Sequence, residues 1–120
     1  MKVCLIEPPK FVSLTNFVST ISMPPIGLAY IAAAIREEGH DVTVVDGPGS
    51  APRNYHIFKD EIRVRGLTQE QIIERIPFDA QVIGLGCMFT SHWMYVRQLV
   101  SKIRKQFPKA FLLMGGEHVT

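Results

Sequence analysis

Four loops of this chain combine bare backbone with side chains suited to holding a ligand. They cover residues 7–9, 46–49, 86–92 and 115–118. Their glycines permit close approach of a ligand to the backbone, and Thr90, Ser91 and two histidines supply hydrogen-bonding groups. This mixture suits a large, flat, partly apolar ligand with a phosphate or amide periphery better than a compact polar one.

Each of these loops follows a short apolar run that predicts a β-strand. The runs cover residues 3–6, 42–45, 81–86 and 110–114. Strands that are apolar on both faces are typical of a parallel sheet covered on each side. In open α/β sheets, ligands lie beyond the carboxyl ends of the strands. We therefore expect the four loops to meet at one edge of the sheet.

Three helical patterns separate the predicted strands. The apolar stripe within residues 28–35 has helical spacing, and Gly39 is placed to end that helix in a left-handed conformation. Thr68 and Gln71 form a capping box at the start of a second helix. Ser91 is expected to cap a third, longer helix, which runs to Phe107.

Strands that alternate with helices predict right-handed crossovers and a parallel sheet. Short strands and the lack of a nucleotide fingerprint after the first one favour a flavodoxin-like (Rossmann-type) α/β fold with strand order 2-1-3-4. Residues 10–23 are expected to form a loop, and residues 50–66 an insertion with at most short elements.

The fifth strand that usually completes this strand order is not predicted. Strand four would then have a bare edge, which natural proteins generally avoid. We expect residues 1–120 to form one domain that is part of a larger protein. It should either self-associate through strand four or pair with a partner chain that supplies the missing strand.

Composition and charge exclude several classes of protein. Hydrophobic residues make up 47% and charged residues 20% of the chain, as in ordinary globular domains. The net charge of +2 is too small to indicate nucleic-acid binding. Neither a signal sequence nor a long apolar membrane span is present, so a cytoplasmic location is expected. Cys4 and Cys87 lack metal-cluster spacing and are expected to be buried, reduced thiols.

The chain resembles the cobalamin-binding N-terminal domain of the cobalamin-dependent radical SAM enzymes. Three motifs in series carry the resemblance: Pro-Pro-Ile-Gly-Leu at residues 24–28, Gly-His-Asp-Val at 39–42, and Gly-Gly-Glu-His-Val-Thr at 115–120. It spans nearly the whole chain and keeps the order of the elements, but residues 50–66 do not contribute.

The resemblance implies a bound cobalamin, with its corrin ring across the strand ends and its nucleotide tail passing into the sheet. Thr90 and Ser91 would hydrogen-bond the tail or merely cap the helix, and Met88 and Phe89 would pack on the corrin or fill the core. The cofactor-binding residues implied by the resemblance are Pro8, Pro9, Gly27, Met88, Phe89, Thr90, Ser91, Gly115, Gly116, Glu117 and His118.

Two departures limit the chemistry that the resemblance implies. The iron–sulfur cysteine motif is absent, so an iron–sulfur cluster and S-adenosylmethionine would be held only by the missing part of a methyltransferase or related radical enzyme. The Asp-x-His-x-x-Gly motif of other cobalamin proteins is also absent after the first strand, where the loop continues Lys10-Phe11. No protein histidine is therefore expected on the lower face of cobalt, although His92 and His118 are weaker alternatives.

Two other functions fit the predicted fold. One is a flavodoxin-like domain that binds FMN or another phosphate-bearing ligand, although the loop after strand one lacks a Ser/Thr/Gly-rich phosphate cradle. The other is a receiver-like regulatory module without a cofactor, which would need clustered acids. Glu7, Asp46 and Glu117 are too scattered along the sequence to establish such a cluster.

Overall fold

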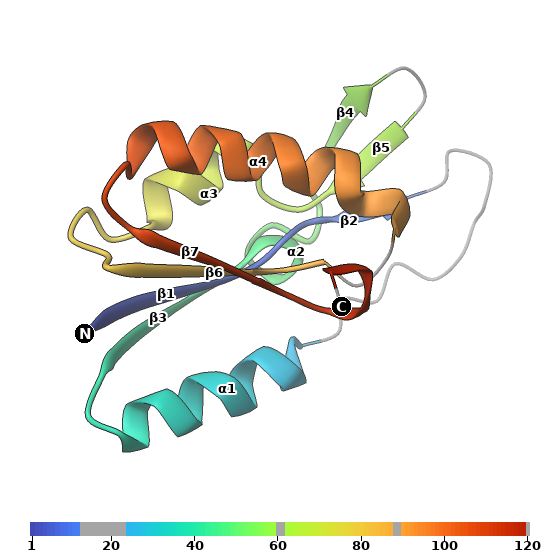
Figure 1. Cartoon of the computed structure of the whole chain (residues 1–120). Coiled ribbons are helices and arrows are strands. Elements are labelled where there is room, and N and C mark those ends of the chain that lie inside the picture. Colours follow the sequence, from blue (N-terminus) through green and yellow to red (C-terminus); the bar gives the residue numbers. More distant parts are fainter. Residues whose placement is uncertain (13–23, 60–61, 88–89, 120) are drawn as a thin grey trace.

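The central element of the fold is a four-stranded parallel sheet. The computed structural model describes residues 1–12, 24–59, 62–87 and 90–119. The sheet has the order β3-β1-β6-β7, which confirms the predicted order 2-1-3-4 (Figure 1). Its strands are β1 (Lys2–Glu7), β3 (Asp41–Asp46), β6 (Val82–Gly86) and β7 (Phe111–Gly115).

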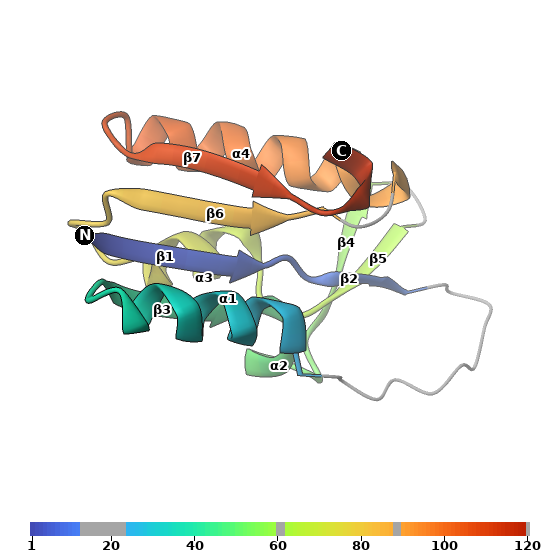
Figure 2. The same cartoon turned by 60° about the horizontal axis from the view of Figure 1, so that its bottom comes forward.

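Helices cover both faces of this sheet (Figures 1 and 2). On one face α1 (Ile26–Glu37) packs over β1 and β3, where Leu28 and Ala32 meet Val3. On the other face lie α3 (Gln69–Arg75) and α4 (Trp93–Gln106). Because successive side chains of a strand point to opposite faces, β1 contributes alternate residues to two separate cores.

The helix boundaries agree with the predicted caps at two of three positions. Thr68 and Gln71 form the capping box of α3, and Gly39 has a φ of +90° just beyond α1. The prediction that Ser91 caps the long helix is wrong, because His92 occupies that position and makes no side-chain cap bond. Ser91 lies instead inside a 3₁₀ turn, η1 (Thr90–His92), that leads into α4.

A second, antiparallel sheet lies beside the parallel one and has the order β2-β5-β4. It contains β2 (Lys10–Val12), β4 (Tyr55–Lys59) and β5 (Ile62–Arg65). The loop predicted from residue 10 is therefore wrong at its start, while residues 13–23 lie outside the described part. The short helix α2 (Gly47–Ser50) replaces the expected turn, and the Asp46 side chain accepts a bond from the Gly49 N–H.

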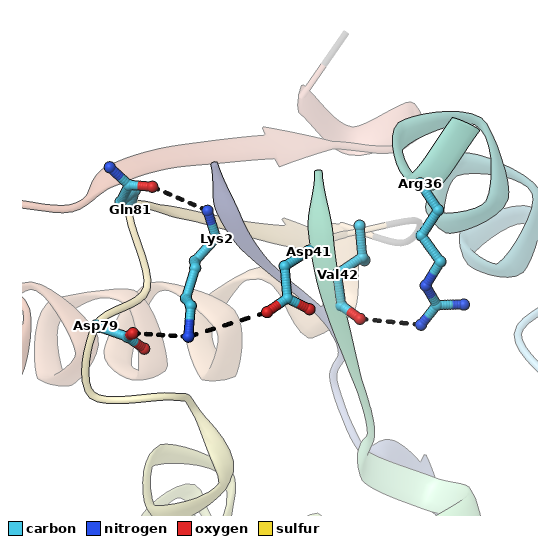
Figure 3. Close-up of polar contacts among 6 residues, drawn as sticks. All are labelled: Lys2, Arg36, Asp41, Val42, Asp79 and Gln81. Carbon is cyan, nitrogen blue, oxygen red and sulfur yellow. Dashed lines mark hydrogen bonds and ion pairs between the residues drawn. The ribbon is translucent and has the colours of Figure 1, made fainter. Parts of the chain in front are cut away.

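Polar contacts at the amino-terminal end of the sheet connect its elements (Figure 3). Lys2 Nζ lies 2.8 Å from Asp79 and 3.9 Å from Asp41, while its backbone N–H donates to the Gln81 side chain. The hydrogen bond from Lys2 lowers the pKa of Asp79. Arg36 of α1 donates to the Val42 carbonyl over 2.9 Å, which fixes that helix against β3. These contacts lie at the amino-terminal end of the sheet, opposite the carboxyl-terminal end where the predicted ligand-binding loops begin.

Within the described residues, no helix has both the length and the apolar character needed to cross a membrane. Both cysteines are buried and neither forms a disulfide bond, as predicted. Burial raises the pKa of the Cys4 thiol to about 12, so it stays protonated at neutral pH.

Candidate functional site at the strand ends

A pocket of about 290 Å³ lies at the carboxyl ends of β1 and β6. It is at the lower limit of ordinary small-molecule sites, so only part of a large cofactor fits inside it. Its lining comes from both central strands, the chain entering β2, the start of α4 and the loop after β7. The lining residues are Glu7, Pro8, Pro9, Lys10, Gly86, Cys87, His92, Val96 and Gly116.

The Pro8-Pro9 segment forms a rigid wall of this pocket. Both prolines are buried, and a Cβ atom on Gly47 would lie 2.6 Å from the Glu7 carbonyl oxygen and 3.0 Å from Pro9 N, so this glycine has no room for a side chain. Lys10 and Glu7 form an ion pair at 2.5 Å across the two ends of the segment. The lining side chains thus carry one paired cation and no phosphate cradle of clustered hydroxyls.

His92 places an imidazole ring in the pocket. Its ring centroid lies 4.5 Å from that of Phe11 in β2, and Phe11 packs edge-on against the buried Tyr95. Burial lowers the pKa of His92, and the charge of Lys10 lowers it further. A neutral imidazole can both donate and accept a hydrogen bond. His92 therefore offers a polar atom on an otherwise aromatic and apolar side of the pocket.

Protonation of His92 should destabilise the fold. The pKa of His92 is lowered in the folded state, so the folded chain binds a proton less readily than the unfolded chain does. The contribution of neutral His92 to the free energy of unfolding is therefore complete above the ordinary histidine pKa of 6.5 and is lost as the pH falls below it. In His92→Gln, the unfolding midpoint should fall less steeply on acidification than in the parent chain. His56, whose pKa burial also lowers, should account for a further part of the slope. An unchanged acid slope in His92→Gln, measured by thermal unfolding, would contradict this assignment.

Gly116 is required by the fold itself. Its φ is +106°, and a Cβ atom would lie 2.5 Å from the carbonyl oxygen of Cys87. Each of these two conditions excludes an L side chain at position 116, whether or not a ligand binds nearby. The presence of glycine at this position is therefore explained by the packing of the loop after β7 on Cys87.

Three other glycines have no such internal reason. Gly27, Gly86 and Gly115 have ordinary backbone conformations, and a Cβ atom on each would meet no atom of the described residues within 4 Å. At every other glycine of the chain, either φ is positive or another atom lies within 3.0 Å of the position that a Cβ would take. The fold would accept side chains at these three positions, and glycine costs conformational entropy there.

All three glycines lie at the carboxyl-terminal end of the sheet. Gly86 and Gly115 pair with each other in neighbouring strands, so they share a face. That face is the α1 side, because Val82, four residues before Gly86, packs in the α1 core. Gly27 lies in the first turn of α1, on the side of the helix opposite Arg36. Within the described part of the chain, bare backbone therefore borders open space on the α1 side of β6 and β7.

The structure places only some of the other predicted site residues in this region. Pro8, Pro9 and Gly116 line the pocket, whereas Gly115 is not a lining residue and pairs with the lining residue Gly86 in the neighbouring strand. Thr90 and Ser91 are exposed in η1, while Glu117 and His118 lie in a second 3₁₀ turn, η2 (Glu117–Val119). Met88 and Phe89 lie outside the described residues. These assignments remain predictions.

Several pocket residues were not among the predicted site residues. Gly86, Cys87 and His92 lie in a loop that was predicted to be at the site. From the sequence, however, Cys87 was expected only to be a buried thiol, and His92 was considered only as a weaker alternative ligand of cobalt. The pairing of Gly86 with Gly115 could have been predicted from strand order alone. Lys10 and Val96 had no comparable signal. Among the described residues, no three His, Cys, Asp or Glu side chains form a metal-binding group.

The chain belongs to the B12 binding domain family, which matches residues 14–120. An α/β structure with a four-stranded parallel sheet agrees with that membership. This identifies the domain as a cobalamin-binding module, as the motifs predicted.

Two curated relatives are methyltransferases by name. The chain is 35% identical over its whole length to 22% of the "Uncharacterized methyltransferase PH0819" of Pyrococcus horikoshii. Over 78% of its length it is 27% identical to 18% of the cytidylyl-2-hydroxyethylphosphonate methyltransferase of Streptomyces wedmorensis. The chain thus spans about a fifth of the length of these relatives. No solved structure matches it.

Proposed function

We propose that this chain is the cobalamin cradle of a larger methyltransferase of the cobalamin-dependent radical SAM class. The family assignment and the names of both relatives support cobalamin and methyl transfer. S-adenosylmethionine and an iron–sulfur cluster would be held by polypeptide outside these 120 residues. The radical chemistry rests on the motif resemblance, since the chain itself has no cluster-type cysteine spacing.

The observation that carries the proposal is the set of three glycines without an internal requirement. Gly27, Gly86 and Gly115 keep the α1 side of the strand ends bare, because a Cβ on each would project into space that no described residue fills. A flat ligand can approach backbone amides and carbonyls closely only where side chains are missing. We propose that this bare backbone contacts the nucleotide tail of the cofactor. The strand ends and their pocket would contact one side of the corrin ring.

The residues around the bare backbone provide the polar and apolar contacts that such a cofactor needs. His92 offers a neutral imidazole beside Phe11, and the buried prolines give a rigid apolar wall. Thr90 and Ser91 are exposed in η1, the turn whose last residue, His92, lines the pocket. We propose that they hydrogen-bond the amide or phosphate groups of the cofactor periphery. Met88, Phe89, Glu117 and His118 complete the proposed contact set.

When bound, cobalamin supplies a cobalt centre that carries a methyl group between donor and acceptor. The role of this chain is to hold that group in one orientation and to shield one side of it from water. The loop after β1 continues from Glu7 through Pro8 and Pro9 to Lys10 and offers no imidazole. We therefore propose that the cobalt receives no histidine from this loop.

The proposal is tested by titrating the purified chain with hydroxocobalamin and, separately, with FMN. We expect calorimetry to show saturable binding of hydroxocobalamin and no binding of FMN at the same concentrations. FMN binding without cobalamin binding would favour the flavodoxin-like alternative. Binding of neither ligand would favour a regulatory module without a cofactor and would contradict the proposal.

A further inference from the structure

A second groove of the molecule lies between β4 and α4, which are side by side (Figures 1 and 2). We call it the β4–α4 groove. Its volume is about 520 Å³, within the ordinary range for small-molecule sites. It shares no lining residue with the pocket at the strand ends. The lining residues are Phe58, Lys59, Met94, Arg97, Gln98 and Ser101.

An irregularity in β4 brings a lysine to this groove. The ladder between β4 and β5 shifts register between Ile57 and Lys59, which leaves Phe58 as an extra residue. In a regular strand, Lys59 would lie on the same side as Ile57, opposite the side on which Phe58 packs against α4. β-Bulges re-aim side chains in this way and are over-represented next to active sites. The shift explains why the adjacent residues Phe58 and Lys59 both line the groove.

The other wall of the groove is one side of α4. Its four lining residues are three or four positions apart, so they share that side of the helix. The sequence of α4 contains no acidic residue. Lys59 and Arg97 therefore border the groove from two different elements, and neither forms an ion pair with any described residue. Because like charges repel, an anion between these two cations would be stabilised.

A buried glutamine fixes a neutral hydrogen-bonding group of the groove. Gln69 of α3 is only 6% exposed, and its side-chain N–H donates to Oε1 of Gln98 over 3.0 Å. With its oxygen engaged in this way, the Gln98 amide keeps its own N–H groups as donors that a ligand in the groove can use. The hydroxyl of Ser101 lies one turn further along the same side of α4.

The groove also has an apolar part. Phe58 packs edge-on against the buried Tyr95, with the ring centroids 5.0 Å apart, so its ring is held in place. Met94 is 45% exposed, and a thioether makes favourable contacts with aromatic rings. These two side chains suit a flat ring, whereas the cations and neutral donors suit the oxygens of a phosphate.

We propose that the β4–α4 groove binds a phosphate ester that carries a flat ring, which is the chemistry of a nucleotide. Lys59 and Arg97 hold the phosphate, since the guanidinium fork matches phosphate oxygens. The ring lies against Phe58 and Met94. The site goes beyond the proposed function, because the groove and the strand-end pocket have no lining residue in common.

The test follows the Met94 methyl group by NMR in the complete protein that contains this chain, labelled with ¹³C at its methionine methyl groups. The Met94 signal is assigned by its loss in Met94→Leu, and Met114 of β7, which does not line the groove, is the control. Adenosine 5′-monophosphate should shift the Met94 signal saturably and leave the Met114 signal unchanged. Adenosine and inorganic phosphate each lack one half of the ligand and should bind at least about tenfold more weakly.

Charge variants identify the groups that hold the phosphate. Arg97→Gln and Lys59→Gln should each raise the dissociation constant for adenosine 5′-monophosphate about tenfold, because each removes a charge-assisted hydrogen bond. Lys105→Gln removes an exposed cation of the same helix that does not line the groove, so it should leave the constant unchanged. All three side chains are exposed, so the variants should fold like the parent.

None of these titrations contains added cobalamin, so failure of the proposed function would not change their outcome. An unshifted Met94 signal would overturn the proposal, as would an effect of Lys105→Gln equal to that of Arg97→Gln. Inorganic phosphate that binds as tightly as adenosine 5′-monophosphate would show that no ring is bound and would also overturn it. Much tighter binding of a single-stranded RNA would assign the surface to nucleic acid instead.

Discussion

Replacing Gly115 by Val should abolish tight cobalamin binding and leave the fold intact. A Cβ atom at position 115 would meet no atom of the described residues within 4 Å, and the valine methyl groups would project into the space that we assign to the cofactor. Valine also favours an extended strand more than glycine does. We expect the dissociation constant for hydroxocobalamin to rise at least about tenfold, which corresponds to about 1.4 kcal/mol. The thermal midpoint should stay the same or rise.

Gly115→Ala and Gly86→Val are the matched variants. The smaller alanine should weaken binding less than valine does, because it fills less of the proposed space. Gly86→Val should behave like Gly115→Val, since the two residues pair in neighbouring strands. Calorimetric titration combined with circular dichroism measures both quantities. If both valine variants fold and bind hydroxocobalamin as tightly as the parent, the cofactor does not approach this backbone.

Replacing Gly116 by Val should instead unfold or severely destabilise the chain. The Cβ would lie 2.5 Å from the Cys87 oxygen in a backbone conformation with φ of +106°. A left-handed conformation and overpacking together cost about 3 kcal/mol or more. That is a large part of the roughly 5–15 kcal/mol of stability that is typical of a domain. We expect the thermal midpoint without ligand to fall by more than about 10 °C.

Gly39→Ala provides the comparison for backbone conformation alone. Gly39 has a φ of +90°, but a Cβ added there would meet none of the described atoms within 4 Å, so the substitution should cost only about 1–2 kcal/mol. The difference between the two variants measures the clash with Cys87. A Gly116→Val chain as stable as the parent that merely failed to bind cobalamin would show that Gly116 serves the ligand and not the fold.

The sequence was sufficient to predict the parallel sheet because the signals for its strands and helices lie within short segments of the chain. Each strand is one apolar run, and the spacing of residues 28–35 fixes the buried side of α1 without reference to other elements. The capping box of Thr68 and Gln71 is similarly contained within four residues. Strand order then follows from crossover handedness and from the lack of a nucleotide fingerprint.

The second sheet could not be predicted in the same way. Its ladder pairs Phe11 with Val64, which are more than 50 residues apart in the sequence, and its strands have only three to five residues. Such short strands carry little periodicity. Phe11 is fixed by its tertiary contacts with Phe58, Tyr95 and His92, none of which is near it in the sequence.

The candidate site was predicted at the level of loops and less well at the level of residues. Strand ends must meet at one edge, so the loops after β1, β6 and β7 could be placed together from the fold alone. The sequence could not distinguish a glycine needed for packing, such as Gly116, from one that borders open space, such as Gly115. That distinction depends on whether the Cys87 carbonyl lies nearby, which is a tertiary contact.

The most direct test of cobalamin binding is the absorption spectrum of the chain purified from cells that are supplied with cobalamin. We predict the red to orange bands of a cobalamin that remains bound through gel filtration, in a one-to-one ratio with protein. The same preparation of Gly115→Val should be folded and colourless. A colourless parent chain that also takes up no added hydroxocobalamin, or a yellow one with flavin bands, would contradict the assignment of this domain to cobalamin.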